Sequence, residues 1–156
     1  MDKTCSILGI NYNWAEVNPH LLKQLKTEIK RLISSERVTI FLIEQSYCRS
    51  PVVRIINDLK ERNKLIKVTL VVQCPAELNF DIDYFKERYG PDFDDVVSFD
   101  PQVKVLRARN LRTYKWMIDQ ADYLLCYLKD DYSINQSILK HAKRKKTLQI
   151  INLAIQ

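Results

Sequence analysis

Glycine is nearly absent from this chain: only Gly9 and Gly90 occur among its 156 residues. Loops that wrap a phosphate group in their backbone amides need glycine, because a Cβ atom blocks the close approach. The sequence therefore lacks the glycine-rich loops of P-loop enzymes and of dinucleotide-binding domains. Any phosphate-binding function has to work without this device.

Long apolar runs are missing as well. No stretch approaches the roughly 18 apolar residues that span a bilayer. The opening MDKTCSILGI has no small-residue cleavage site behind its short apolar stretch, so it predicts a strand and not a signal peptide. We therefore expect a cytoplasmic protein with no membrane partner.

Pairs of metal-binding or redox-active residues are also lacking. The chain has four cysteines, Cys5, Cys48, Cys74 and Cys126. None forms a C-x-x-C pair, which argues against a zinc site and a redox motif. The histidines, His20 and His141, lie far from any candidate metal ligand in the sequence. We predict no metal and no cofactor.

What the chain does contain is an alternation of apolar runs and amphipathic stretches. Strands are predicted at 5–10, 38–43, 66–72, 103–106, 123–128 and 148–154. Helices are predicted at 19–34, 51–59, 82–89, 111–121 and 133–146, the first two beginning with Asn-Pro and Ser-Pro cap signals. The connections are long enough for right-handed crossovers, which favours parallel strands. Residues 1–156 are thus predicted to form one α/β domain, a Rossmann-like three-layer sandwich with about six mainly parallel strands and helices on both faces.

Charge is distributed unevenly. The net charge is +6, yet residues 77–100 hold eight acids and two bases, a net −6, which leaves +12 on the remainder. The last predicted helix ends in the basic run 140–146 (KHAKRKK), where cations also suit a helix C-terminus. Such asymmetry indicates either nucleic-acid binding or self-association through complementary faces.

Two sequence stretches resemble a known family. Residues 3–12 (KTCSILGINY) are similar to the T-C-C-F-T-G-H-R-P start of the SLOG superfamily, in its YpsA-like branch. Residues 116–125 (WMIDQADYLL) are similar to that branch's M-V-D-x-S-D-x-L-I signature. The resemblance implies a Rossmann-like fold that binds nucleotide-derived ligands. Some relatives, the LOG enzymes, split an N-glycosidic bond of nucleoside monophosphates.

The residues that the resemblance places at the ligand differ from the family pattern. After Gly9, the family's His-Arg is replaced by Ile10 and Asn11, and F-I-S-G-G-A-x-G-F-D is replaced by residues 41–50 (FLIEQSYCRS). Its Arg-Asn and Gly-Gly-Thr are replaced by residues 113–114 and 133–135. The candidate ligand-binding residues are therefore Gly9, Asn11, Glu44, Gln45, Ser46, Ser50, Thr113, Tyr114, Ser133 and Asn135.

Acidic residues take the place of the missing glycines. Glu44, Asp130 and Asp131 fall where backbone amides would hold phosphate. A like charge at ~4 Å costs about 4 kcal/mol at an effective dielectric near 20. The leading hypothesis is thus a non-catalytic, divergent SLOG-like module, which senses a nucleotide-derived ligand or acts through a protein partner or a homo-oligomer.

Two alternatives stay open. One is a nucleoside or nucleotide hydrolase with Glu44 as acid/base and with Ser46, Asn11 and Asn135 positioning the substrate. The other is a nucleic-acid-binding accessory protein that uses the basic run. A pocket filled by Glu44, Tyr47 and Ile134 would indicate an interaction module.

Overall fold

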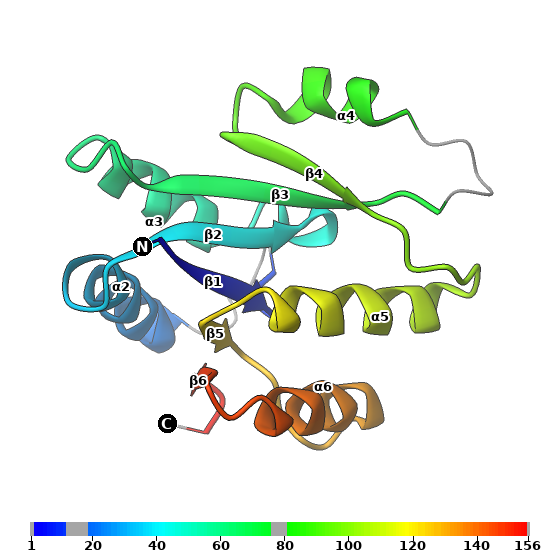
Figure 1. Ribbon diagram of the computed structural model, residues 1–156. Helices are drawn as coiled ribbons and strands as arrows, with labels where there is room; N and C mark the ends of the chain where they lie inside the picture. Colours follow the sequence, from blue (N-terminus) through cyan, green and yellow to red (C-terminus); the bar gives the residue numbers. More distant parts are fainter. Residues whose placement is uncertain (1, 12–18, 76–80, 156) are drawn as a thin grey trace.

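The computed structural model describes residues 2–11, 19–75 and 81–155 (Figure 1). It contains a six-stranded sheet, all parallel, in the order β4-β3-β2-β1-β5-β6. The strands are β1 (Lys3–Leu8), β2 (Val38–Glu44), β3 (Lys67–Gln73), β4 (Asp95–Phe99), β5 (Tyr123–Cys126) and β6 (Gln149–Asn152). The helices are α2 (Pro19–Ser34), α3 (Pro51–Lys60), α4 (Ile82–Tyr89), α5 (Leu106–Asp119) and α6 (Ser133–Arg144), with a short 3-10 helix, η1 (Gln45–Tyr47).

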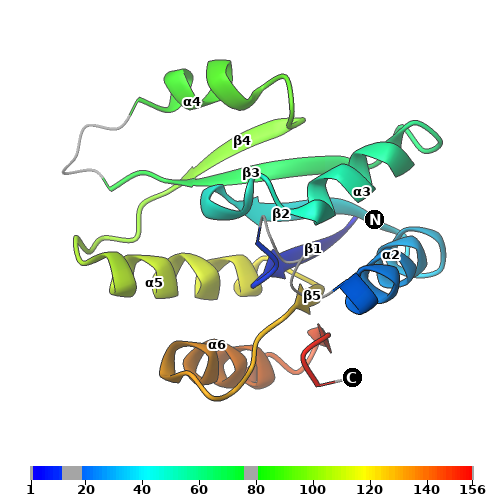
Figure 2. The ribbon, with the colours of Figure 1, turned by 180° about the vertical axis from the view of Figure 1, so that it is seen from behind.

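Helices cover both faces of the sheet, as Figures 1 and 2 show. Ile29 of α2 and Ile56 of α3 are fully buried in one apolar cluster with Phe41 of the sheet. Met117 of α5 and Ala142 of α6 belong to a second cluster on the other face. Because the strands are buried on both sides, they are apolar almost without interruption. The predicted Rossmann-like three-layer α/β fold is confirmed.

The prediction for the fourth strand was wrong. Residues 103–106 form no strand: Val105 is 70% exposed and precedes α5, which begins at Leu106 instead of near 111. The fourth strand is β4, whose Val96 and Val97 pack toward opposite apolar clusters. β4 is an edge strand and carries the exposed residue Asp95. Because acidic residues surround it in the sequence, the apolar pattern did not predict it. Residues 107–110, which lie between the predicted strand and the predicted helix, are consequently part of α5.

From β1, the strands β2 to β4 follow one another toward one edge of the sheet, and β5 and β6 follow toward the other edge. The strand order therefore reverses between β1 and β5. Ligands of such sheets bind beyond the carboxyl ends of the strands at this switch point. Gly9 lies there with φ 80°, and a Cβ atom on it would overlap the carbonyl oxygen of Tyr127. Tyr127 also donates its backbone N–H to Leu8 at 3.1 Å. Gly9 thus lets the two backbones meet.

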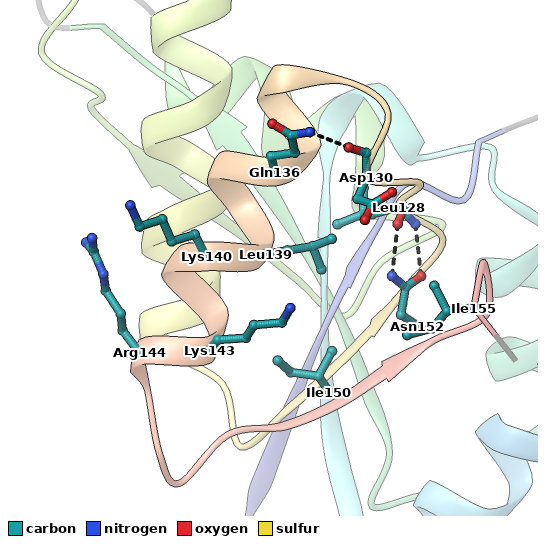
Figure 3. Close-up of a pocket in the computed structure, with 10 residues that line it drawn as sticks. All are labelled: Leu128, Asp130, Gln136, Leu139, Lys140, Lys143, Arg144, Ile150, Asn152 and Ile155. Atoms are coloured by element: carbon teal, nitrogen blue, oxygen red, sulfur yellow. Dashed lines mark hydrogen bonds between the residues drawn. The ribbon is translucent and has the colours of Figure 1, made fainter.

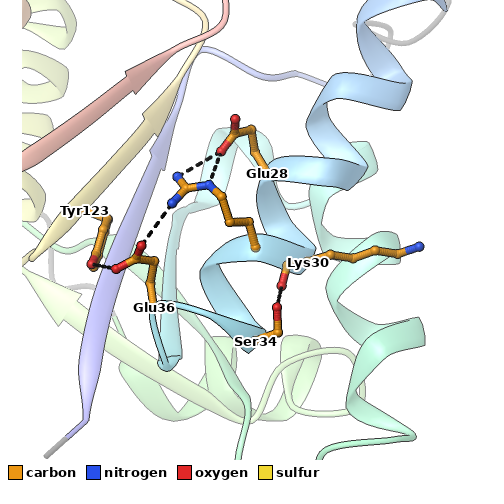
Figure 4. Close-up of polar contacts among 6 residues, drawn as sticks. Glu28, Lys30, Ser34, Glu36 and Tyr123 are labelled. Carbon is orange, nitrogen blue, oxygen red and sulfur yellow. Dashed lines mark hydrogen bonds and ion pairs between the residues drawn. The ribbon is translucent and has the colours of Figure 1, made fainter.

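The amino end of β5 is joined to the end of α2 by side chains (Figure 4). The Tyr123 hydroxyl donates to Glu36 at 2.7 Å, and Arg31 bridges Glu36 and Glu28 at 3.2 and 3.0 Å. The hydrogen bond to Glu36 raises the pKa of Tyr123 to about 12. This phenol therefore remains a neutral donor at ordinary pH.

The helix ends agree with the cap signals where they can be compared. Ser50 is the N-cap of α3, with Pro51 at the first helical position, as predicted. Asn18, the expected cap of α2, lies outside the described residues. None of the described helices combines the length and the apolar character that a bilayer span requires.

Candidate functional site at the carboxyl edge of the sheet

Glu44, the acid/base candidate, ends β2 and is only 3% exposed. Its Oε2 accepts the Ser46 backbone N–H at 2.8 Å and the Ser46 hydroxyl. Its Oε1 accepts the Gln73 side-chain amide at 3.2 Å. The carboxylate thereby caps η1. The Ser46 amide, which could otherwise donate to a phosphate at this strand end, thus donates to the protein's own carboxylate.

Gln73 and Asn110 complete this polar cluster. The Gln73 Nε2 donates both to Glu44 and, at 2.8 Å, to Asn110 Oδ1 on α5. Because Nε2 faces two acceptors, Oε1 points away from them, and it is buried without a partner among the described residues. Sequence reasoning missed both residues. Gln73 follows the predicted strand 66–72, and Asn110 lies between the predicted strand 103–106 and the predicted helix 111–121, so neither pattern singled out its side chain.

Two tyrosines fill the space next to Glu44. The rings of Tyr47 and Tyr114 lie 6.3 Å apart between centroids, at 40° to each other. Tyr47 packs against both apolar clusters, and the nearby backbone of Gly9 acts to lower the pKa of its phenol. Burial raises the pKa of both phenols, and the Glu44 carboxylate adds to the rise. Uncharged aromatic side chains therefore occupy this part of the edge.

The structure thus brings together Gly9, Glu44, Ser46 and Tyr114 from the candidate set. Besides burial, the neighbouring Tyr47 and Glu44 raise the pKa of Tyr114, and Ser46 acts to lower it. Glu44 and Tyr47 pack into the interior, and Ile134 packs against the second apolar cluster. Of the three side chains expected to fill a closed pocket, Glu44 and Tyr47 lie together at this edge, and the Glu44 carboxylate raises the pKa of the Tyr47 phenol.

Two further candidates have structural roles inside helices. Ser50 is buried and accepts the Val52 N–H at 3.3 Å as the cap of α3. Thr113 is fully buried, and its hydroxyl donates to the Arg109 carbonyl at 2.8 Å. Their side chains are committed to the helices that contain them. Neither is available to position a substrate.

The remaining candidates make no hydrogen bond to Glu44 among the described residues. Asn135 donates to the Lys129 carbonyl at 2.7 Å, and Ser133 accepts a hydrogen bond from Arg107. Asn11 is exposed and Gln45 is half-buried. Within the described residues, no hydrogen bond joins any of these four side chains to the carboxylate. The side chains of Asn135 and Gln136 tie the loop after β5 to the start of α6, because they donate to the carbonyls of residues 129 and 130.

The cysteines are uncharged thiols in this structure. Cys5 and Cys126 are buried, and burial raises the pKa of Cys126 to about 12. Burial also raises the pKa of Cys48, against the opposing effect of Arg49. A nucleophilic thiolate is thus disfavoured at Cys48. Over the described residues, no three histidine, cysteine or acidic side chains gather as a metal site would require.

A cavity lies elsewhere, between α6 and β6 (Figure 3). Its volume is about 650 Å³, and Asp130 is part of its lining.

Comparison of the chain with models of known protein families gave no match, and neither did comparison with curated proteins.

Proposed function

We propose that the chain is a cytoplasmic, non-catalytic interaction module on a divergent SLOG-like frame. One observation carries this proposal: the Glu44 carboxylate accepts the hydrogen bond of the Ser46 backbone amide at the end of β2. Gln73, Tyr47 and Tyr114 close the same edge around it. The module acts through its surface and not through a phosphate-binding crevice.

Electrostatics supports the exclusion of phosphate. A phosphate at ~4 Å from an ionised carboxylate is disfavoured by about 4 kcal/mol at an effective dielectric near 20. The arginine that would offset this repulsion in the family pattern is replaced by Asn11. Gly9, which would give phosphate its approach, instead faces the carbonyl of Tyr127. A nucleotide would have to displace all of these contacts.

The hydrolase alternative is poorly supported by the same geometry. A general acid or base has to come within hydrogen-bond reach of the substrate. Both oxygens of Glu44 are bonded to Ser46 and Gln73 and are withdrawn from solvent. Asn135, proposed to position the substrate, is held by a backbone carbonyl.

A second candidate function rests on two unsatisfied polar atoms. Gln73 Oε1 and Arg109 Nε are buried and have no partner among the described residues. Leaving such groups unpaired costs about 1–3 kcal/mol each. A small neutral ligand, such as a nucleoside without phosphate, would supply the missing partners and give the module a sensory role.

Two measurements test these proposals. Nucleoside monophosphates should leave the melting temperature unchanged, and chromatography should detect no free base after incubation. Saturable stabilisation by a monophosphate, or base release that Glu44→Gln abolishes, would contradict a non-catalytic module with a closed edge. Stabilisation by the nucleoside alone, lost in Gln73→Leu, would establish the sensory function instead.

A further inference from the structure

The groove between α6 and β6 is bounded by one stripe of the helix and one face of the strand. Gln136, Leu139 and Lys143 are spaced by three and four residues, so they lie on the same side of α6. Ile150 and Asn152, two residues apart on β6, line the groove from below (Figure 3). The volume of about 650 Å³ lies within the about 300–1,000 Å³ typical of binding sites.

The floor of this groove is apolar. It is formed by Leu128, Leu139, Ile150 and Ile155, of which Ile155 is 78% exposed. The polar side chain in the floor, Asn152, accepts the Leu128 N–H at 3.1 Å and donates to the Leu128 carbonyl at 2.9 Å (Figure 3). Because this amide is engaged within the protein, the floor offers an occupant apolar contact.

β6 is the last strand of the sheet, and its backbone is open on the side away from β5. Gln149 and Leu153 donate their backbone N–H groups to carbonyls on the β5 side, at 3.1 and 2.9 Å. Alternate residues of a parallel strand bond in opposite directions, so the backbone groups of Ile150 and Asn152 point to the open edge. The Asn152 carbonyl accepts the Ile155 N–H at 3.3 Å. The N–H and C=O of Ile150 and the N–H of Asn152 are thus placed to pair with a further strand.

Cations border one end of the groove. Lys140, Lys143 and Arg144 are exposed near the end of α6, and none of the ion pairs between described residues includes them. Lys143 points toward the groove (Figure 3). The acid in the lining, Asp130, lies at the start of the helix, where Gln136 donates to its backbone carbonyl at 2.6 Å. An occupant that places a carboxylate at the cationic end would complement this charge.

We propose that the groove binds an extended, acidic segment of a partner protein, which pairs with β6 as an added edge strand. Main-chain hydrogen bonds to Ile150 and Asn152 hold the segment, and only an extended backbone can use them. Every second side chain of the segment points toward α6. Apolar ones lie on the floor, and a carboxylate pairs with Lys143 and Arg144. The inference rests on the proposed function, since it names the partner of the interaction module.

A synthetic peptide tests this pairing. The probe is fluorescein-labelled Glu-Thr-Val-Thr-Val-Thr-Glu-amide, whose glutamates and valines share one face of a strand. Fluorescence anisotropy with the full chain should show saturable binding in about 0.05 M salt. Lysine in place of both glutamates should weaken binding at least about ten-fold. The Debye length of about 3 Å in about 1 M salt should weaken the binding of the acidic probe as well.

Variants of the groove separate pairing from net charge. Lys143→Glu with Arg144→Glu should weaken binding of the probe at least about ten-fold, because like charges then face its glutamates. Lys26→Glu with Lys30→Glu makes the same charge change on exposed positions of α2, on the other face of the sheet, and should bind like the original chain. Ile155→Ser should weaken binding while leaving every charge in place. Circular dichroism should show that all variants are folded.

Strand addition has a signature that surface attraction lacks. Hydrogen exchange followed by NMR should slow at least about ten-fold at the amides of Ile150 and Asn152 when the probe is bound. The amide of Gln149, which already donates on the β5 side, should keep its rate.

Several outcomes would overturn the inference. They are a probe that shows no saturable binding, equal binding of the lysine peptide, and unchanged exchange at Ile150. Dodecanoate that binds in place of the probe would make the groove a small-molecule pocket. Single-stranded DNA that binds through Lys143 and Arg144 while the probe does not would assign the cations to nucleic acid.

Failure of the peptide experiment leaves the proposed function intact if nucleotides neither bind nor turn over. Nucleotide turnover contradicts the proposed function whatever the peptide does.

Discussion

The carboxyl edge around Glu44 and the groove beside β6 differ in how their charged groups are held. Glu44 is buried and bonded to Ser46 and Gln73. Along the groove, Lys143 and Arg144 face solvent over an open apolar floor. The carboxylate that sequence patterns favour at a ligand site is buried and paired, whereas the charged side chains beside the sheet's outer strand face solvent. Substitutions should therefore be costly in the first region and tolerated in the second.

At the carboxyl edge, the largest effect is expected from Gly9→Ala. The residue has φ 80°, and its new Cβ would meet the Tyr127 carbonyl, a backbone group that cannot rotate away. We expect a loss of about 3 kcal/mol in the free energy of unfolding, measured by urea denaturation. Asn11→Ala, at an exposed position nearby, should cost less than about 0.5 kcal/mol. Equal stability of the two variants would show that the close approach at the switch point does not matter.

Glu44→Ala should come next. It leaves the Gln73 amide with one acceptor fewer and removes the cap of η1, at a cost of about 2 kcal/mol. Asp130→Ala is the matched control, because this acid is exposed and its side chain lines the open groove. Urea denaturation should separate the two variants clearly. If Glu44→Ala were as stable as the control, the carboxylate would be free for chemistry and the edge would not be closed by it.

Much of the fold follows from local patterns, but the closure of the edge does not. Apolar runs such as 38–43 and the Ser50-Pro51 cap are local signals, and the structure agrees with both. β4 was not predicted, because an edge strand needs apolar residues at fewer positions. The acidic residues in and around it also resembled those of a loop. The Glu44–Gln73–Asn110 cluster joins residues 29 and 37 positions apart. Its formation depends on strand order and on α5 starting early, neither of which is visible in the local sequence.

The bond between Tyr123 and Glu36 shows what one hydrogen bond to a carboxylate contributes in this fold. Tyr123→Phe should cost about 1 kcal/mol at pH 8. The pKa of Tyr123 is raised from 10.0 to about 12, so the folded state holds this proton more tightly than the unfolded state does. The stabilisation is therefore complete below about pH 10 and is lost as the pH rises through about 12. The difference between the two proteins in unfolding free energy should shrink between pH 8 and pH 12. A constant difference would mean that the bond does not set the pKa.

The smallest effect is expected in the groove itself, and it decides whether that surface is open. Ile155→Ser exchanges a side chain that is 78% exposed, so the unfolding free energy should change by less than about 0.5 kcal/mol. In contrast, Ile151→Ala removes a buried side chain of β6 and should cost about 2–5 kcal/mol. Urea denaturation measures both. A loss of more than about 1 kcal/mol from Ile155→Ser would place this residue in the core and remove the contrast with the edge around Glu44.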